Sequence, residues 1–107
     1  MVVILTRERD YEKTPDGSLP LIRRAFRKYP RFVEAMETRA QRYNQCRREL
    51  FELEQQGRVL VIAPESTAGF SRTERDLEKI RALWQSGYFA GRSALPAVRE
   101  FWFGQNP

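Results

Sequence analysis

The chain has 107 residues, which allows one small domain at most. Its 41% hydrophobic and 31% charged residues are typical of a globular protein and argue against disorder. The net charge is +5, so nucleic acid and anionic lipid are candidate partners, although arginines interleaved with glutamates also occur on solvated helices. Histidine is absent from the sequence, which excludes histidine-based nucleophile activation, proton transfer and metal binding.

The cysteine count and the hydrophobic runs indicate the compartment. Cys46 has no second thiol for an internal disulfide, and without histidine a structural zinc site is excluded as well. No apolar run approaches the roughly 20 residues of a membrane span. Met1 leads into an apolar run without a basic segment or a cleavage site, so we expect no signal peptide. We therefore expect a cytoplasmic protein, with a peripheral place at the inner membrane as an alternative.

Two short apolar runs predict β-strands. Residues 2–6 open the chain, and residues 59–63 lie between Gly57 and Pro64. A half-exposed strand would alternate with polar residues, so both runs predict strands buried on both faces. More than fifty residues separate them, and such a crossover joins parallel strands. Because two parallel strands are too few to be stable alone, we expect them to be the edge of a larger sheet.

The segment after the first strand combines a loop and a short helix. Residues 7–19 predict a polar loop in which Asp16-Gly17 follows a proline, and we assign Asp16 to a turn, not to an active site. Residues 19–28 predict an amphipathic helix with Pro20 in its first turn. Tyr29-Pro30 ends that helix, because the residue before a proline is pushed out of helical geometry.

Residues 31–56 predict the longest helix, which Gly57 ends in a left-handed conformation. It would be about 39 Å long, which is more than a small domain needs. A coiled coil is the alternative interpretation of its apolar stripe. Cys46 lies beside that stripe, so we expect a packed, unreactive thiol. The stripe steps by seven residues through Tyr29, Met36, Tyr43 and Leu50.

Two further helices are predicted after the second strand. The first begins at Ser71 or Thr73, each with an acidic residue three positions later, and runs to Ser86 before Gly87. The second covers residues 88–103, and Pro96 either kinks it or starts a new turn. We expect the aromatic residues of both to be core. The predicted fold is a single α/β domain over residues 1–107, in the order β-α-α-β-α-α.

Catalytic motifs are absent from the sequence. It has no phosphate-binding loop, no dinucleotide fingerprint and no Gly-x-Ser-x-Gly elbow. The carboxylate pairs Glu8/Asp10 and Glu52/Glu54 are interpreted as solvated surface, with no reason for a raised pKa. We therefore assign no catalytic, cofactor-binding or metal-binding residue.

Basic residues gather in two parts of the chain. Arg23, Arg27 and Arg31 would share a face only if the helix continued through Tyr29-Pro30, so we do not expect a nucleic-acid interface. Anionic membrane surface stays open as a partner, because aromatic residues lie near the later arginines. The basic residues concerned are Arg23, Arg24, Arg27, Lys28, Arg31, Arg39, Arg42, Arg47 and Arg48, and the aromatic ones are Trp84, Tyr88, Phe89, Phe101, Trp102 and Phe103.

Taken together, a series of motifs resembles the C-terminal region of bacterial patatin-like phospholipases. Each motif is weak alone, but their order and spacing cover nearly the whole chain. They are Ile4-Leu5-Thr6-Arg7, Lys28-Tyr29-Pro30, Arg42-Tyr43-Asn44, Gly57-Arg58-Val59-Leu60-Val61-Ile62-Ala63-Pro64, Arg72-Thr73-Glu74-Arg75-Asp76, Glu78-Lys79, Ala82-Leu83-Trp84, Gly87-Tyr88 and Ala94-Leu95-Pro96.

The resemblance implies an α/β sandwich with a mainly parallel sheet, and hydrolysis of lipid acyl esters by a Ser-Asp dyad without histidine, metal or other cofactor. The motifs that carry the dyad lie upstream in that family, and none maps onto this chain. Asp16-Gly17-Ser18 follows the strand that the resemblance places after the dyad loop, so it is not that loop. The chain departs from the family pattern at Arg39-Ala40-Gln41 and Asp76-Leu77, which argues against a polar role for the middle of the long helix.

We therefore expect a C-terminal structural domain of a patatin-like lipid acyl hydrolase, not catalytic by itself, whose partner is the upstream domain of the same protein. One alternative is a free-standing module that associates with a second copy. The other is a basic module that binds anionic lipid or nucleic acid.

Overall fold

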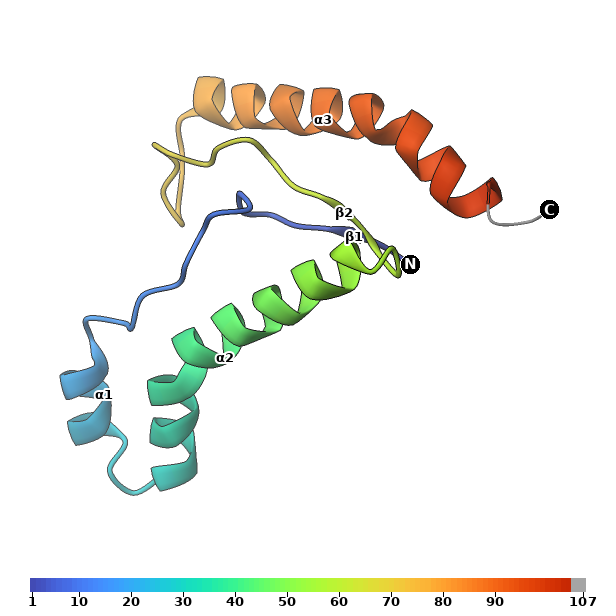
Figure 1. The fold of residues 1–107 in the computed structure, drawn as a ribbon. Helices are drawn as coiled ribbons and strands as arrows, with labels where there is room; N and C mark the ends of the chain where they lie inside the picture. The colour runs from blue at the N-terminus through green and yellow to red at the C-terminus, as the bar shows by residue number, and fades with distance from the viewer. Residues whose placement is uncertain (105–107) are drawn as a thin grey trace. The chain divides into compact units, whose positions relative to one another are not determined.

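A computed structural model describes residues 1–104 (Figure 1). Residues 1–11 and 53–104 form one compact unit, and residues 12–52 form a second. The elements follow the order β1 (Val2–Ile4), α1 (Leu19–Ala25), α2 (Pro30–Gln55), β2 (Leu60–Ile62) and α3 (Leu77–Phe103).

The two strands form a parallel pair, which confirms the predicted α/β class and strand direction. Each strand is shorter than predicted, with three residues in the ladder. The Leu60 N–H donates to the Met1 carbonyl at 3.0 Å, and the Leu5 N–H donates to the Ile62 carbonyl at 2.8 Å. The register pairs Val2 with Leu60, Val3 with Val61 and Ile4 with Ile62.

The prediction that both strands are buried on both faces is wrong for this chain. Val61 is 5% exposed, but Ile4 is 73% exposed. Helix α3 packs against β2, while no second layer of the described residues covers Ile4. A sheet of two three-residue strands offers little surface for packing, so apolar side chains stay uncovered where no helix reaches them.

Helices α1 and α2 lie close to their predicted bounds. Pro20 occupies the first turn of α1, where its missing N–H costs nothing. Gly57 ends α2 with φ 70°, and the Gly57 and Arg58 N–H groups donate to the carbonyls of Glu54 and Leu53. This Schellman arrangement satisfies carbonyls at the helix end and confirms the predicted stop.

The C-terminal region is one helix, so the two helices predicted there are wrong. Gly87 lies inside α3, because glycine lowers helix stability without breaking the hydrogen-bond ladder. The helix begins at Leu77, since the Asp76 carboxylate accepts the N–H groups of Glu78 and Lys79. Pro96 also lies inside it, and Figure 1 shows α3 bending in its C-terminal part, as the kink alternative predicted.

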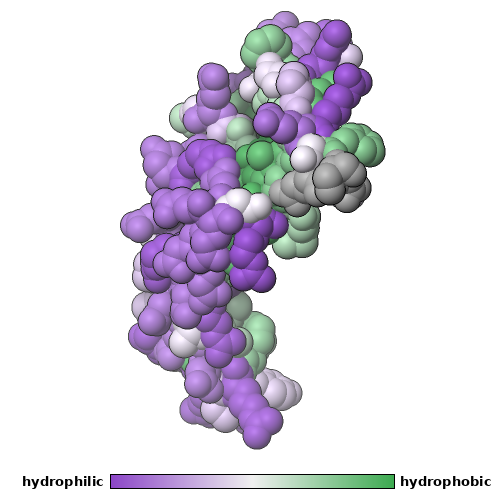
Figure 2. All heavy atoms as spheres, turned by 45° about the vertical axis from the view of Figure 1, so that its right-hand side comes forward, coloured by the Kyte–Doolittle hydropathy of each residue, from purple (hydrophilic) through white to green (hydrophobic). Residues whose placement is uncertain are grey.

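Few hydrophobic residues are buried. Within residues 1–104 the buried apolar residues are Ala40, Val59 and Val61. No residue of Leu77–Phe103 is buried, so the prediction that the aromatic residues of α3 are core is wrong. Figure 2 shows hydrophobic residues exposed in several places on a largely hydrophilic face.

Candidate functional site

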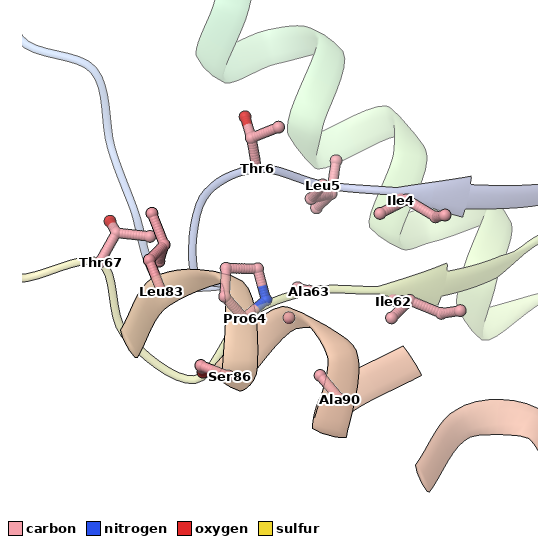
Figure 3. Close-up of a pocket in the computed structure, with 11 residues that line it drawn as sticks. Ile4, Leu5, Thr6, Ile62, Ala63, Pro64, Thr67, Leu83, Ser86 and Ala90 are labelled. Atoms are coloured by element: carbon pink, nitrogen blue, oxygen red, sulfur yellow. The ribbon is translucent and has the colours of Figure 1, made fainter. Parts of the chain in front are cut away.

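A cavity of about 240 Å³ lies beyond the carboxyl ends of the two strands, where open parallel sheets commonly bind ligands. Figure 3 shows Ile4 and Ile62 on the strands and Ala90 on α3 around this space. Gly87 and Ala90 carry little or no side chain, which leaves room between the helix and the sheet. The lining residues are Ile4, Leu5, Thr6, Ile62, Ala63, Pro64, Thr67, Leu83, Ser86, Gly87 and Ala90.

The lining of this cavity is mainly apolar. Its polar side chains are the hydroxyls of Thr6, Thr67 and Ser86, and the lining holds no ionisable side chain. The cavity can therefore accept an apolar group beside three hydroxyls.

A polar cluster ties together the loops that leave the two strands. The buried Thr67 hydroxyl donates to the Glu8 carboxylate and accepts from the Arg7 guanidinium, whose Nη1 lies 2.7 Å away. The hydrogen bond from Thr67 holds the pKa of Glu8 below its usual value. Arg7 also lies over the Tyr11 ring, 4.6 Å from its centre. These groups satisfy one another, so the cluster fixes the loops.

An ion pair closes the outer edge of β2. Arg9 donates from Nη1 and Nη2 to the two carboxylate oxygens of Glu54 at 2.6 and 2.7 Å. Nη2 also donates to the Val61 carbonyl at 3.1 Å, and the Val61 N–H donates to the Glu54 carboxylate. The hydrogen bonds from Arg9 keep the pKa of Glu54 low. Because the N–H and the carbonyl of Val61 are both hydrogen-bonded to this ion pair, they are not available to a further strand beside β2.

The outer edge of β1 is open. In a parallel ladder alternate residues point their N–H and C=O groups to opposite sides. The bonds from Leu60 to Met1 and from Leu5 to Ile62 place the backbone groups of Val2 and Ile4 on the side away from β2. In the described part of the chain these backbone groups have no hydrogen-bond partner. We call Val2 and Ile4 the open edge.

Several sequence-based assignments are changed by the structure. Asp16 belongs to a turn as predicted, because its carboxylate accepts the Ser18 N–H at 2.9 Å. Cys46 is exposed on α2, so the predicted packed thiol is wrong. Glu8 and Glu54 bond to partners 59 and 45 residues away and are half-buried, so they are less solvated than expected. As expected, neither carboxylate has a raised pKa. No local pattern marked Arg9, Glu54 or Thr67, because their partners are distant in sequence.

Three basic residues of the second unit, Arg24, Arg27 and Lys28, line one hollow beside α1. Helix α1 ends at Ala25 and α2 begins at Pro30, which confirms the predicted break between them. Arg23 forms an ion pair with Glu37. Arg47 is buried, and its guanidinium lies over the rings of Tyr43 and Phe51. The middle of α2 thus uses an arginine in packing.

Residues 1–104 contain neither a helix that could span a membrane nor a cluster of metal-binding side chains. No helix there has both the length and the hydrophobicity that crossing a bilayer requires. Nor do three or more carboxylate or thiol groups in this range come together as metal ligands would.

Residues 29–103 match the family described as a domain of unknown function, DUF6363. The chain belongs to this family. The match covers α2, β2 and α3 of this DUF6363 member, while β1 and α1 lie outside the matched residues. Searches of the curated proteins and of the solved structures found no match to the chain.

Proposed function

We propose that the chain is the C-terminal structural part of a patatin-like lipid acyl hydrolase, and that an upstream segment of the same protein adds a strand beside β1. The observation that carries this proposal is the difference between the two sheet edges. The Arg9–Glu54 pair occupies the backbone of β2, whereas the open edge at Val2 and Ile4 has unused hydrogen-bonding groups and an exposed Ile4 side chain. An added strand would satisfy those groups and cover Ile4.

The lack of a reactive group in the cavity supports an accessory role. The cavity at the strand ends has an apolar lining with three hydroxyls. The carboxylates of Glu8, in the loop after β1, and Glu54, at the edge of β2, have lowered pKa values. A general acid at neutral pH needs a raised carboxyl pKa. In this proposal the dyad that cleaves the ester belongs to the upstream segment, and this chain completes the sheet.

The first test is the size of the native product in the source cells, measured by immunoblot with an antibody raised against this chain. The expected band is far heavier than 12.7 kDa, which is the mass of the chain itself. A band at the mass of the chain itself would refute an upstream segment and would favour the free-standing module. Ester hydrolysis by the purified chain that persists after Ser-to-Ala replacements would refute the accessory role.

A second test measures strand addition by amide hydrogen exchange. The Ile4 N–H should exchange rapidly in the isolated chain and slowly in the native product, because only there would a neighbouring strand accept it. The Leu5 N–H is the matched control, since it already donates to Ile62 and should be protected in both. Equal, rapid exchange of Ile4 in both samples would refute strand addition at the open edge.

A further inference from the structure

One side of α3 carries a stripe of large apolar residues that nothing in residues 1–104 covers. We call it the aromatic face. At 3.6 residues per turn, steps of four, seven and eleven residues return to nearly the same side of a helix. The members are 46% to 75% exposed, and the rings of Trp84 and Tyr88 stack with centres 5.5 Å apart. The aromatic face consists of Leu77, Trp84, Tyr88, Leu95 and Trp102.

The opposite side of α3 is the one used by the fold. Leu83, Ser86, Gly87 and Ala90 line the cavity against the strands, and Phe101 lines a hollow with Leu60. The aromatic face is therefore not needed to hold α3 on the sheet. Because large exposed apolar stripes are uncommon on soluble monomers, this one indicates a binding surface.

Three arginines run along the aromatic face. Arg81, Arg92 and Arg99 each follow a member of the face by four residues, which makes them its neighbours on the helix surface. All three are exposed. The acidic residues of α3 are Glu78 and Glu100, and Glu100 lines the hollow on the sheet side. The face thus combines aromatic rings with positive charge and includes no carboxylate.

We infer that the aromatic face of α3 binds the surface of an anionic lipid bilayer. Tryptophan and tyrosine favour the boundary between headgroups and acyl chains, and arginine reaches from an apolar face to the phosphates. A second copy of the chain fits less well, because the face has no carboxylate to pair with the arginines of its partner. The inference does not rest on the proposed function, since strand addition uses β1 and lipid binding uses the far side of α3.

The chain supplies its own probe for the test. Its two tryptophans, Trp84 and Trp102, both belong to the aromatic face. Adding vesicles made of equal parts of phosphatidylcholine and phosphatidylglycerol to the full chain should shift tryptophan emission to the blue and carry the chain up in a flotation gradient. Vesicles of phosphatidylcholine alone should do neither. Equal binding to both vesicles, or none to either, would overturn the inference.

Two pairs of variants locate the contact. Each variant must show the same far-UV circular dichroism as the parent chain, so that a loss of binding is not a loss of folding. Trp84→Ala should weaken binding at least fivefold. Phe89→Ala should not, because Phe89 is similarly exposed but lies about 140° away from Trp84 around the same helix. Replacing Arg81, Arg92 and Arg99 by Gln should weaken binding roughly a hundredfold, at about fivefold per basic residue near an anionic surface.

The matched triple variant replaces Arg24, Arg27 and Arg31 by Gln and removes the same charge from α1, the turn after it and the start of α2. It should bind like the parent chain. An equal loss in the two triple variants would mean that net charge, not the aromatic face, drives binding. A chain that ignores vesicles but forms a dimer that Trp84→Ala dissociates would assign the face to a second copy and overturn the inference.

Discussion

Breaking the Arg9–Glu54 pair tests whether it closes the edge of β2. The Arg9 side chain is 53% exposed and that of Glu54 24%, so the ion pair alone should contribute about 0.2–1 kcal/mol. Each residue also bonds the buried Val61 peptide, and one such bond contributes about 1 kcal/mol. We therefore expect Arg9→Ala or Glu54→Gln to lower the free energy of unfolding by about 1–2 kcal/mol.

A double-mutant cycle in urea unfolding measures the coupling, and amide exchange at Val61 reports the edge. The coupling between Arg9 and Glu54 should be about 0.5–1 kcal/mol, and Glu54→Gln should speed exchange of the Val61 N–H. Arg23–Glu37 is the matched control, because it is an exposed ion pair that touches no strand. A coupling energy no larger than that of the control, with unchanged exchange of the Val61 N–H, would refute the role of the Arg9–Glu54 pair at the edge of β2.

Three further predictions concern the helix ends and pH. Gly57→Ala should lower the free energy of unfolding by about 1 kcal/mol, since its φ of 70° strains any L-residue although space is available; an unchanged urea midpoint would contradict this. Asp76→Ala should cost about 1 kcal/mol while Ser71→Ala costs little, because Asp76 caps α3; equal effects would place the cap elsewhere. The pKa of Glu54 is lower in the folded chain than in the unfolded one, so ionised Glu54 stabilises the fold above the unfolded pKa of about 4.3, and this stabilisation is lost as pH falls through the folded pKa. The Glu54→Gln variant should therefore lose less stability on acidification than the parent chain. Parallel profiles of unfolding free energy against pH would contradict this.

The parts of the fold that could be predicted depend on local chemistry. The extent of α2 followed from Pro30 and Gly57, because proline fixes its own φ while glycine adopts the positive φ of a helix end without a steric penalty. The parallel pair followed from two apolar runs separated by a long crossover. The single helix α3 was missed because Gly87 disfavours a helix only weakly, by an amount that neighbouring turns overcome.

The burial of residues could not be predicted in the same way. Hydrophobic patterning indicates which side chains favour leaving water, but it does not say whether this chain or another molecule covers them. Ile4 and Trp84 were expected in a core and are exposed, whereas Arg47, grouped by its charge with the basic residues, is buried. An open sheet edge was expected, but which of the two edges is open could not be predicted, because the bonds of Val61 come from Arg9 and Glu54, far away in sequence.

The open edge and the aromatic face are chemically different surfaces, which is why we assign them two partners. The open edge offers backbone donors and acceptors beside an aliphatic side chain, and only another strand satisfies such groups. The backbone of α3 is hydrogen-bonded within the helix, so the aromatic face presents only side chains, which are aromatic rings flanked by arginines. Such a face binds a surface that is both apolar and anionic. If one protein segment covered both, Ile4 exchange and vesicle binding would change together. If the partners differ, Trp84→Ala should weaken vesicle binding at least fivefold while the exchange of the Ile4 N–H in the native product stays slow.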